Sequence, residues 1–104
     1  MSETFKKEIV QRITRNFLDI TILKLVHAKP MWGYKIKKQI ETLYNVKVRH
    51  GALYPLLNTL EANGFLSSKY QTEKGRKRKI YEITGKGIQY LEAYNNFLKE
   101  QMQN

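Results

Sequence analysis

The stretch that most constrains the fold is residues 48–66, which combines a helical repeat, a stop signal and the start of a strand. The repeat places four leucines on one face of a helix: Leu53, Leu56, Leu57 and Leu60. The opposite face carries small or uncharged residues: Gly51, Pro55, Asn58 and Ala62. A helix with a slim, acid-free outer face in a basic chain predicts a DNA recognition helix, because such a helix fits the major groove.

Charge is unevenly distributed along the chain. The formal net charge is +10, and residues 31–79 hold eleven lysines and arginines against three glutamates. A solvated basic surface is the simpler explanation of such an excess. A nucleic-acid partner is the better one, because the excess lies on one contiguous unit.

Apolar periodicity predicts five helices, at about residues 3–14, 16–28, 34–44, 50–63 and 85–102. Lys29-Pro30 and Asn45 are expected to end the second and third helices, and Ile36, Ile40 and Leu43 to form the inner face of the third. Thr84 is expected to cap the last helix. Period-two alternation predicts strands near 65–70 and 80–83, joined by a basic loop over 71–78 with Gly75 at the turn, and a stub of strand at 46–48.

This order predicts a mainly α fold with a small two- or three-stranded antiparallel sheet. It is a winged helix-turn-helix, in which the hairpin after the recognition helix is the wing, with an extra helix at each end. We expect one domain over 1–104, with an N-terminal helix at 1–15, the winged core at 16–84 and a dimerisation helix at 85–104.

Pro55 leaves the start of the recognition helix open, because proline cannot donate a backbone hydrogen bond. If the helix begins near His50, Pro55 falls just past the first turn and frees the Gly51 carbonyl. If it begins at Pro55, Tyr54 is its cap and the preceding residues form a loop.

Candidate DNA contacts come from the third helix, the start of the recognition helix and the wing. They are Tyr34, Lys35, Lys38, Arg49, His50, Gly51, Ala52, Tyr54, Pro55, Asn58, Lys74, Arg76, Lys77, Arg78 and Lys79. Simpler roles are a solvent-exposed helix start for His50 and a half-buried core position for Tyr54. The basic cluster of the wing is alternatively a solvated loop or a localisation signal, and Trp32 is expected to anchor the start of its helix.

Apolar stripes on the two terminal helices exceed what a chain of this size is expected to cover. We interpret them as a homodimer interface made of Phe5, Ile9, Ile13, Ile88, Tyr90, Leu91, Tyr94, Phe97, Leu98 and Met102. The alternative is that the two terminal helices cover each other within one chain.

Catalysis has little support in a chain with nine acids, two histidines and no cysteine. No phosphate-binding loop, zinc-protease motif or nucleophile elbow is present, so we expect no enzyme activity, cofactor or metal site. No apolar run reaches the roughly 18–20 residues of a membrane span. We therefore expect a cytoplasmic, nucleoid-associated protein with no membrane partner.

Several motifs together resemble the PadR family of prokaryotic transcriptional regulators, in its short form with a single C-terminal helix. They are Gly33-Tyr34-Lys35-Ile36, the segment from His50 to Leu57, the segment from Leu60 to Leu66, and the wing exit from Gly75 to Gly87. The resemblance covers about residues 15–90. It implies a homodimeric repressor-type regulator on a partly palindromic operator, with the helix of Tyr54 in the major groove and Arg76 and Arg78 on the flanking backbone.

The resemblance also implies dimerisation through the C-terminal helix, aided by the N-terminal one. Some relatives bind phenolic compounds or drugs between subunits, so Tyr90, Tyr94 and Phe97 are candidates for a small aromatic effector site, although plain packing is the favoured role. Two other functions stay open at this stage. One is a basic RNA- or ribosome-associated domain, and the other is a winged helix that binds only protein.

Overall fold

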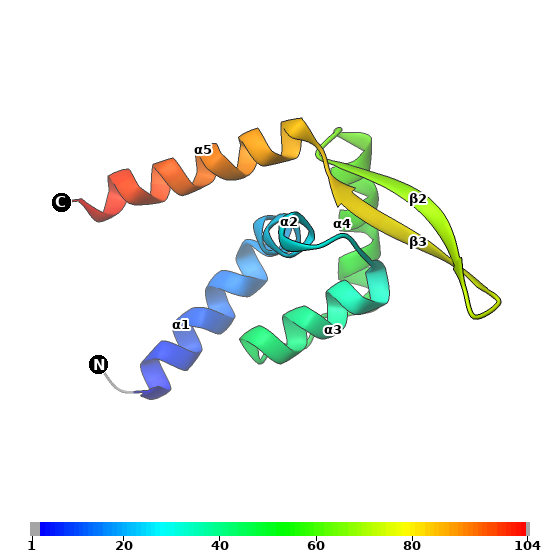
Figure 1. Ribbon diagram of the computed structural model, residues 1–104. Coiled ribbons are helices and arrows are strands. Elements are labelled where there is room, and N and C mark those ends of the chain that lie inside the picture. Colours follow the sequence, from blue (N-terminus) through cyan, green and yellow to red (C-terminus); the bar gives the residue numbers. More distant parts are fainter. Residues whose placement is uncertain (1–2, 104) are drawn as a thin grey trace.

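The computed structural model describes residues 3–103 and forms, over that range, five helices and one three-stranded sheet (Figure 1). The elements are α1 Glu3–Asn16, α2 Leu18–Ala28, β1 Met31–Trp32, α3 Gly33–Tyr44, α4 His50–Ala62, β2 Leu66–Glu73, β3 Arg76–Ile83 and α5 Gly85–Met102. The expected mainly α fold with a small antiparallel sheet is confirmed. None of the described helices has the length and apolar character needed to cross a membrane.

The core is built around α2, which packs against α3, α4, α5 and β3. Ile22 and Leu23 of α2 are fully buried, and α3 and α4 bury their own apolar stripes against the same cluster. Helix α2 ends at Ala28, directly before Lys29-Pro30, as the sequence predicts. Helix α3 ends at Tyr44, where Asn45 takes a left-handed conformation with φ of 54°, so the predicted stop is also confirmed.

Two details of the third helix and the loop after it differ from prediction. Leu43 is 58% exposed, although the repeat places it on the inner face of α3. Periodicity tells which side of a helix a residue occupies, but not where the neighbouring helices end.

Residues 46–48 form no strand. Val46 and Val48 do bury their side chains, so their alternation reflects burial without a pairing backbone.

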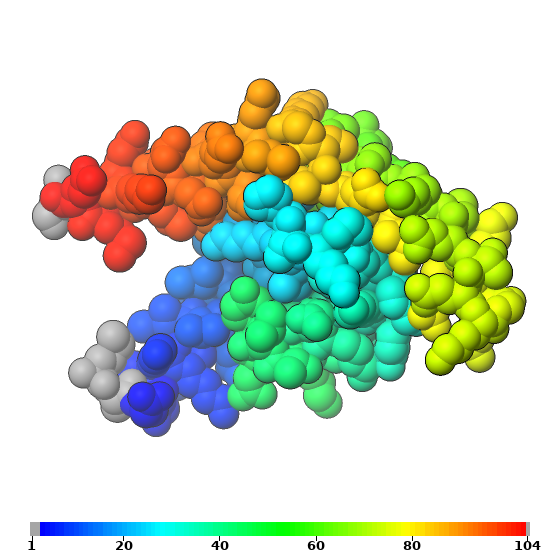
Figure 2. Space-filling model, viewed as in Figure 1, coloured from blue at the N-terminus to red at the C-terminus, as the bar shows by residue number. Residues whose placement is uncertain are grey.

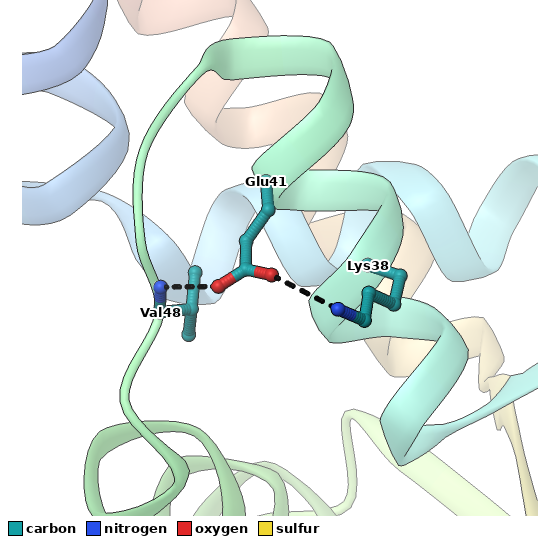
Figure 3. A network of polar contacts seen from close by, with 3 residues as sticks. All are labelled: Lys38, Glu41 and Val48. Atoms are coloured by element: carbon teal, nitrogen blue, oxygen red, sulfur yellow. Dashed lines mark hydrogen bonds and ion pairs between the residues drawn. The ribbon is translucent and has the colours of Figure 1, made fainter.

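The loop before α4 is held by Glu41 instead of by strand pairing. One carboxylate oxygen of Glu41 accepts a hydrogen bond from the Val48 backbone nitrogen at 3.0 Å (Figure 3). The other lies 4.0 Å from the Lys38 ammonium (Figure 3). Glu41 therefore links the helix that carries Lys38 to the segment that leads into α4.

The sheet has the order β1-β3-β2, so its third strand is Met31–Trp32 and not the predicted stub. Strands β2 and β3 pair over their whole lengths, from Leu66 with Ile83 to Glu73 with Arg76. Lys74 and Gly75 alone make the turn, both with positive φ, which is typical of two-residue hairpin turns. Residues 71–73 and 76–78 belong to the paired strands, so the predicted loop over 71–78 is wrong. The sequence did not reveal these strand residues, because strand residues with two solvated faces show no apolar alternation.

Helix α4 begins at His50, so Pro55 lies inside it and the first of the two alternatives holds. The start of α5 is fixed more firmly. Thr84 accepts a hydrogen bond from the Gly87 nitrogen at 3.0 Å and donates one to the Gly64 carbonyl at 2.6 Å, which confirms the predicted cap. Gly87 is buried so tightly that an added Cβ would lie 2.3 Å from the Phe65 carbonyl oxygen.

Helix α1 leads into α2, whereas α5 starts beside β3 and passes α2, and the free ends of α1 and α5 lie apart (Figure 1). The rings of Phe17, directly after α1, and Tyr94, in the middle of α5, lie 5.7 Å apart. The far ends of the two helices lie on the side of the molecule opposite the wing tip, and a notch separates them in the space-filling view (Figure 2). The molecule is accordingly elongated, with extents of 50 × 29 × 21 Å.

Candidate nucleic-acid interface

Helix α4 presents its small residues to solvent. Leu53, Leu57 and Leu60 are buried beneath it. The predicted contacts on its outer side are all exposed, namely His50, Gly51, Ala52, Pro55 and Asn58, as is Arg49 directly before the helix. The outer side of α4 is thus free to approach a ligand closely.

Tyr54 is half-buried and fixes α4 to the start of α3. Its ring packs so closely on Gly33 that a Cβ at this position would lie 2.7 Å from the ring and 3.0 Å from the hydroxyl oxygen. The imidazole of His50 also packs on this ring, with ring centres 4.2 Å apart. The core and contact roles of Tyr54 are compatible, since the ring packs at the border between α4 and the cavity described next.

A cavity of about 390 Å³ lies between α4 and the wing. It brings together six of the predicted DNA contacts from two distant parts of the sequence: Tyr54, Asn58, Arg76, Lys77, Arg78 and Lys79. Trp32, Gly33 and Tyr81 complete its lining. Four basic residues of β3 thus converge with the middle of α4, whereas Lys74, Arg49 and Lys35 do not line this cavity.

Strand register divides the wing into two faces, because successive side chains of a strand point to opposite sides. Lys77, Lys79 and Tyr81 share a face with Ser68 and Tyr70, which are opposite them on β2. The contact of Lys79 with α4 shows that this face is turned toward the recognition helix. The other face carries Arg76 and Arg78 of β3 together with Trp32 of β1.

Lys79 is tied to α4 by an ion pair. Its ammonium lies 3.1 Å from the Glu61 carboxylate, which also accepts a hydrogen bond from the Ser68 hydroxyl. The hydrogen bond from Ser68 and the nearby Lys79 lower the pKa of Glu61, and the bond to Glu61 raises the pKa of Lys79. Lys79 therefore supports the wing, and Glu61 and Ser68 are supporting residues that the sequence did not reveal.

Lys77 of the wing and Lys38 of α3 each lie near an aromatic ring. The Lys77 ammonium lies 4.8 Å from the ring centre of Tyr70, which is 62% exposed. The Lys38 ammonium lies 5.5 Å from the ring of Tyr34. Tyr70 was not among the predicted contacts, and only the length of the hairpin, once known, would have placed it opposite Lys79 and beside Lys77.

The predicted dimer residues fall into two groups. Leu91 is only 6% exposed and belongs to the core of the chain, while Ile88 and Tyr94 are half-buried. The remaining residues are exposed and lie along α1 and α5: Phe5, Ile9, Ile13, Tyr90, Phe97, Leu98 and Met102. We call these seven residues the terminal surface. The helices that carry it diverge instead of lying along each other (Figure 2).

Two of the three candidate effector residues are engaged by aromatic rings of the same chain. Tyr90 packs on Phe65 with ring centres 4.7 Å apart, and Tyr94 packs on Phe17. These contacts favour plain packing for both tyrosines. Within residues 3–103, no three histidine, aspartate or glutamate side chains gather in a way that would hold a metal ion.

Comparison with known proteins agrees with this geometry. A family model described as "Transcriptional regulator PadR-like family" matches residues 22–93. An uncharacterized protein from Lysinibacillus sphaericus is 34% identical over 82 residues, which cover 76% of this chain and 75% of that protein.

Solved structures show the same fold. The X-ray structure of a PadR-like transcription factor from Bacteroides fragilis superposes with a TM-score of 0.76 and 28% identity, over 90% of this chain and 91% of that one. The crystal structure of Bacillus subtilis PadR in complex with operator DNA superposes with a TM-score of 0.69 and 25% identity, over 74% of this chain and 44% of that one.

Proposed function

Because the chain belongs to the PadR-like family of transcriptional regulators, we propose that it acts as a homodimeric repressor on a partly palindromic DNA operator. The observation that carries this proposal is the cavity in which α4 and the basic residues of the wing converge. The Bacillus subtilis relative solved with operator DNA supports the same partner. In the proposal, residues 16–84 bind DNA and residues 85–104 mainly join the subunits.

On DNA, α4 enters the major groove with its outer side. Gly51, Ala52 and Pro55 allow the backbone to come close, and few groups on this side can bond to base edges. Arg49, His50 and Asn58 are the residues we assign to direct reading. Lys38, Tyr54 and the wing bind phosphates, which supply most of the affinity without reading sequence. Much of the specificity then comes from DNA shape and from the spacing of the two subunits.

The terminal surface supports the second subunit. Leu98 and Met102 continue the stripe of α5 that begins with Leu91 and Tyr94, where the helix packs on α2 and Phe17. A second copy of the chain would cover this continuation and the stripe of α1. Two recognition helices would then bind half-sites about 34 Å apart, one turn of B-DNA.

Selection of bound duplexes from a random pool, followed by sequencing, tests the proposal directly. We expect an inverted repeat whose half-sites are about one helical turn apart. Recovery of duplexes without a shared motif would contradict sequence-specific binding, and preference for folded RNA over any duplex DNA would favour the RNA-associated alternative. Affinity that stays constant between low and moderate salt would contradict the phosphate contacts.

A further inference from the structure

Arg78 differs from the other cations of the wing in what holds it. Its guanidinium carbon lies 4.0 Å from the ring centre of Trp32, and its Nη1 lies 3.0 Å from a carboxylate oxygen of Glu73. Its side chain is 26% exposed. We propose that Arg78 is a positioning residue that fixes the angle of the wing, while Lys74, Arg76 and Lys77 make the phosphate contacts. The inference rests on the proposed DNA-binding function.

The stacking partner of Arg78 links the wing to the recognition helix. Trp32 belongs to β1 and directly precedes α3, and its indole lies 5.3 Å from the ring of Tyr34. The next residue, Gly33, is in close contact with the ring of Tyr54 on α4. A continuous path of contacts thus runs from Arg78 through Trp32 and Gly33 to the helix that enters the groove.

The chemistry of the stack suits arginine. A planar guanidinium can lie flat on an indole while its edge binds a carboxylate, and an ammonium group cannot do both. Glu73 lies across the strand pair from Arg76, at the end of the wing. The contact of Arg78 with Glu73 therefore spans from the tip of the hairpin to the β1–α3 junction and braces it on the face opposite Lys77 and Lys79.

One observation favours a competing role. The Nε atom of Arg78 is buried and has no hydrogen-bond acceptor among residues 3–103. A DNA phosphate could supply that acceptor, and Arg78 would then be a phosphate ligand like Arg76. The two roles differ in their dependence on charge and on the flat shape of the side chain, so substitutions can separate them.

The DNA experiment compares Arg78→Ala, Arg78→Lys and the matched variant Arg76→Ala on one labelled mixed-sequence duplex over a range of salt concentrations. We expect Arg76→Ala to reduce the slope of log K against log[salt] by about 0.9, the value for one lost phosphate contact. We expect Arg78→Ala to weaken binding about three- to tenfold with an unchanged slope, and Arg78→Lys to be as weak as Arg78→Ala. Recovery of affinity by lysine, or a slope reduced as in Arg76→Ala, would overturn the proposal.

A second experiment needs no DNA, because Trp32 is the single tryptophan of the chain. We expect Arg78→Ala and Arg78→Lys to change the fluorescence emission of Trp32 in the free protein, and Arg76→Ala to leave it as in the wild type. Unchanged emission in both Arg78 variants would refute the stack. If the wild type itself binds no DNA while the emission changes as expected, the proposed function fails and the bracing of the wing survives.

Discussion

On the wing side of the molecule four cations contact partners within the chain, whereas on the opposite side apolar residues of α1 and α5 are exposed. Lys38, Lys77, Arg78 and Lys79 each lie against an aromatic ring or a carboxylate. The residues of the terminal surface, in contrast, are apolar and exposed, with Met102 as much as 83% exposed. In the proposed function, one chain completes its DNA-binding side by itself, and a second copy of the chain covers the terminal surface.

The largest expected effect comes from placing a charge on the terminal surface. If such a charge changed neither dimerisation nor DNA affinity, the contrast between the two sides of the molecule would be wrong. Leu98→Glu should prevent dimerisation, because a carboxylate would be buried in an apolar interface. Light scattering should then give the 12.3 kDa mass of one chain. Affinity for an inverted-repeat duplex should fall about 100-fold or more, since the two half-sites are no longer bound together.

Asn96→Glu is the matched control, because Asn96 is exposed and lies on the side of α5 away from the stripe of Leu91 and Leu98. This variant should remain dimeric and keep its affinity for the duplex to within a small factor. A wild-type protein that is monomeric at high concentration would refute the dimer outright.

Two glycines test the difference between the exposed side of α4, where Gly51 lies, and the closely packed start of α5, where Gly87 lies. Gly87→Ala should lower the free energy of unfolding by about 1–3 kcal/mol, because its Cβ would clash with the backbone oxygen of Phe65. Gly51→Ala should raise it by about 0.5–1 kcal/mol, because nothing lies within 4 Å of its Cβ and alanine favours the helix. Denaturant unfolding measures both.

For Gly51→Ala, the expected effect on DNA affinity is opposite in sign to the expected effect on stability. Gly51→Ala adds a methyl group to the side of α4 that enters the groove, so it should weaken operator binding despite the gain in stability. An operator affinity equal to that of the wild type would show that this part of α4 does not approach the bases closely.

The wing tip tests whether its cations act together on phosphates. Lys74→Ala combined with Arg76→Ala should reduce the slope of log K against log[salt] by about 1.8, which corresponds to two contacts. All duplex sequences should be weakened alike, because phosphates carry no sequence information. A loss confined to one operator sequence would mean that the wing reads bases.

The smallest expected effect is the pH dependence of the Glu61 and Lys79 pair. The pKa of Glu61 is lowered from 4.5 in the folded chain, so its contribution to stability is present above pH 4.5 and is lost as the pH falls through the folded pKa. The pKa of Lys79 is raised from 10.5, so the same contribution is lost again as the pH rises through the folded pKa of Lys79, which lies above 10.5. Glu61→Gln should therefore destabilise the protein at neutral pH by less than about 1 kcal/mol, and by less as the pH falls through the folded pKa of Glu61.

Thermal unfolding across this pH range measures the effect, with Glu92→Gln as the control for removing an exposed acid. A difference between Glu61→Gln and the wild type that is as large at pH 3 as at pH 7 would show that the pair is not the cause.

The helices could be predicted from sequence because their signals are local. Apolar repeats, Lys29-Pro30 and Asn45 mark their extent with little help from the rest of the chain. Strand β1 could not be predicted, because two residues carry no period and pair only where β3 happens to pass. The length of the hairpin was missed for a related reason, since its outer half lies beyond the core and has no buried face.

The site was predictable in composition but not in the roles of its residues. The sequence identified every cation of the turn and of β3, yet Arg78 and Lys79 turn out to be engaged by Trp32 and Glu61, which only the tertiary fold brings near them. Likewise, Leu91 and Leu98 lie on one stripe of α5, and only the position of α2 decides that the first is buried and the second exposed.

The close packing of Gly87 against Phe65 fixes the start of α5, so a small rotation there is amplified at the far end of the helix. The helix has 18 residues and is therefore about 27 Å long. A rotation of one degree at its packed start would move its far end by about 0.5 Å. If the far end joins the subunits, small changes where α5 meets the sheet alter the distance between the two recognition helices. Gly64, Phe65 and Thr84 at that joint would then help to set which operator spacing the dimer accepts, although all three lie outside α4 itself.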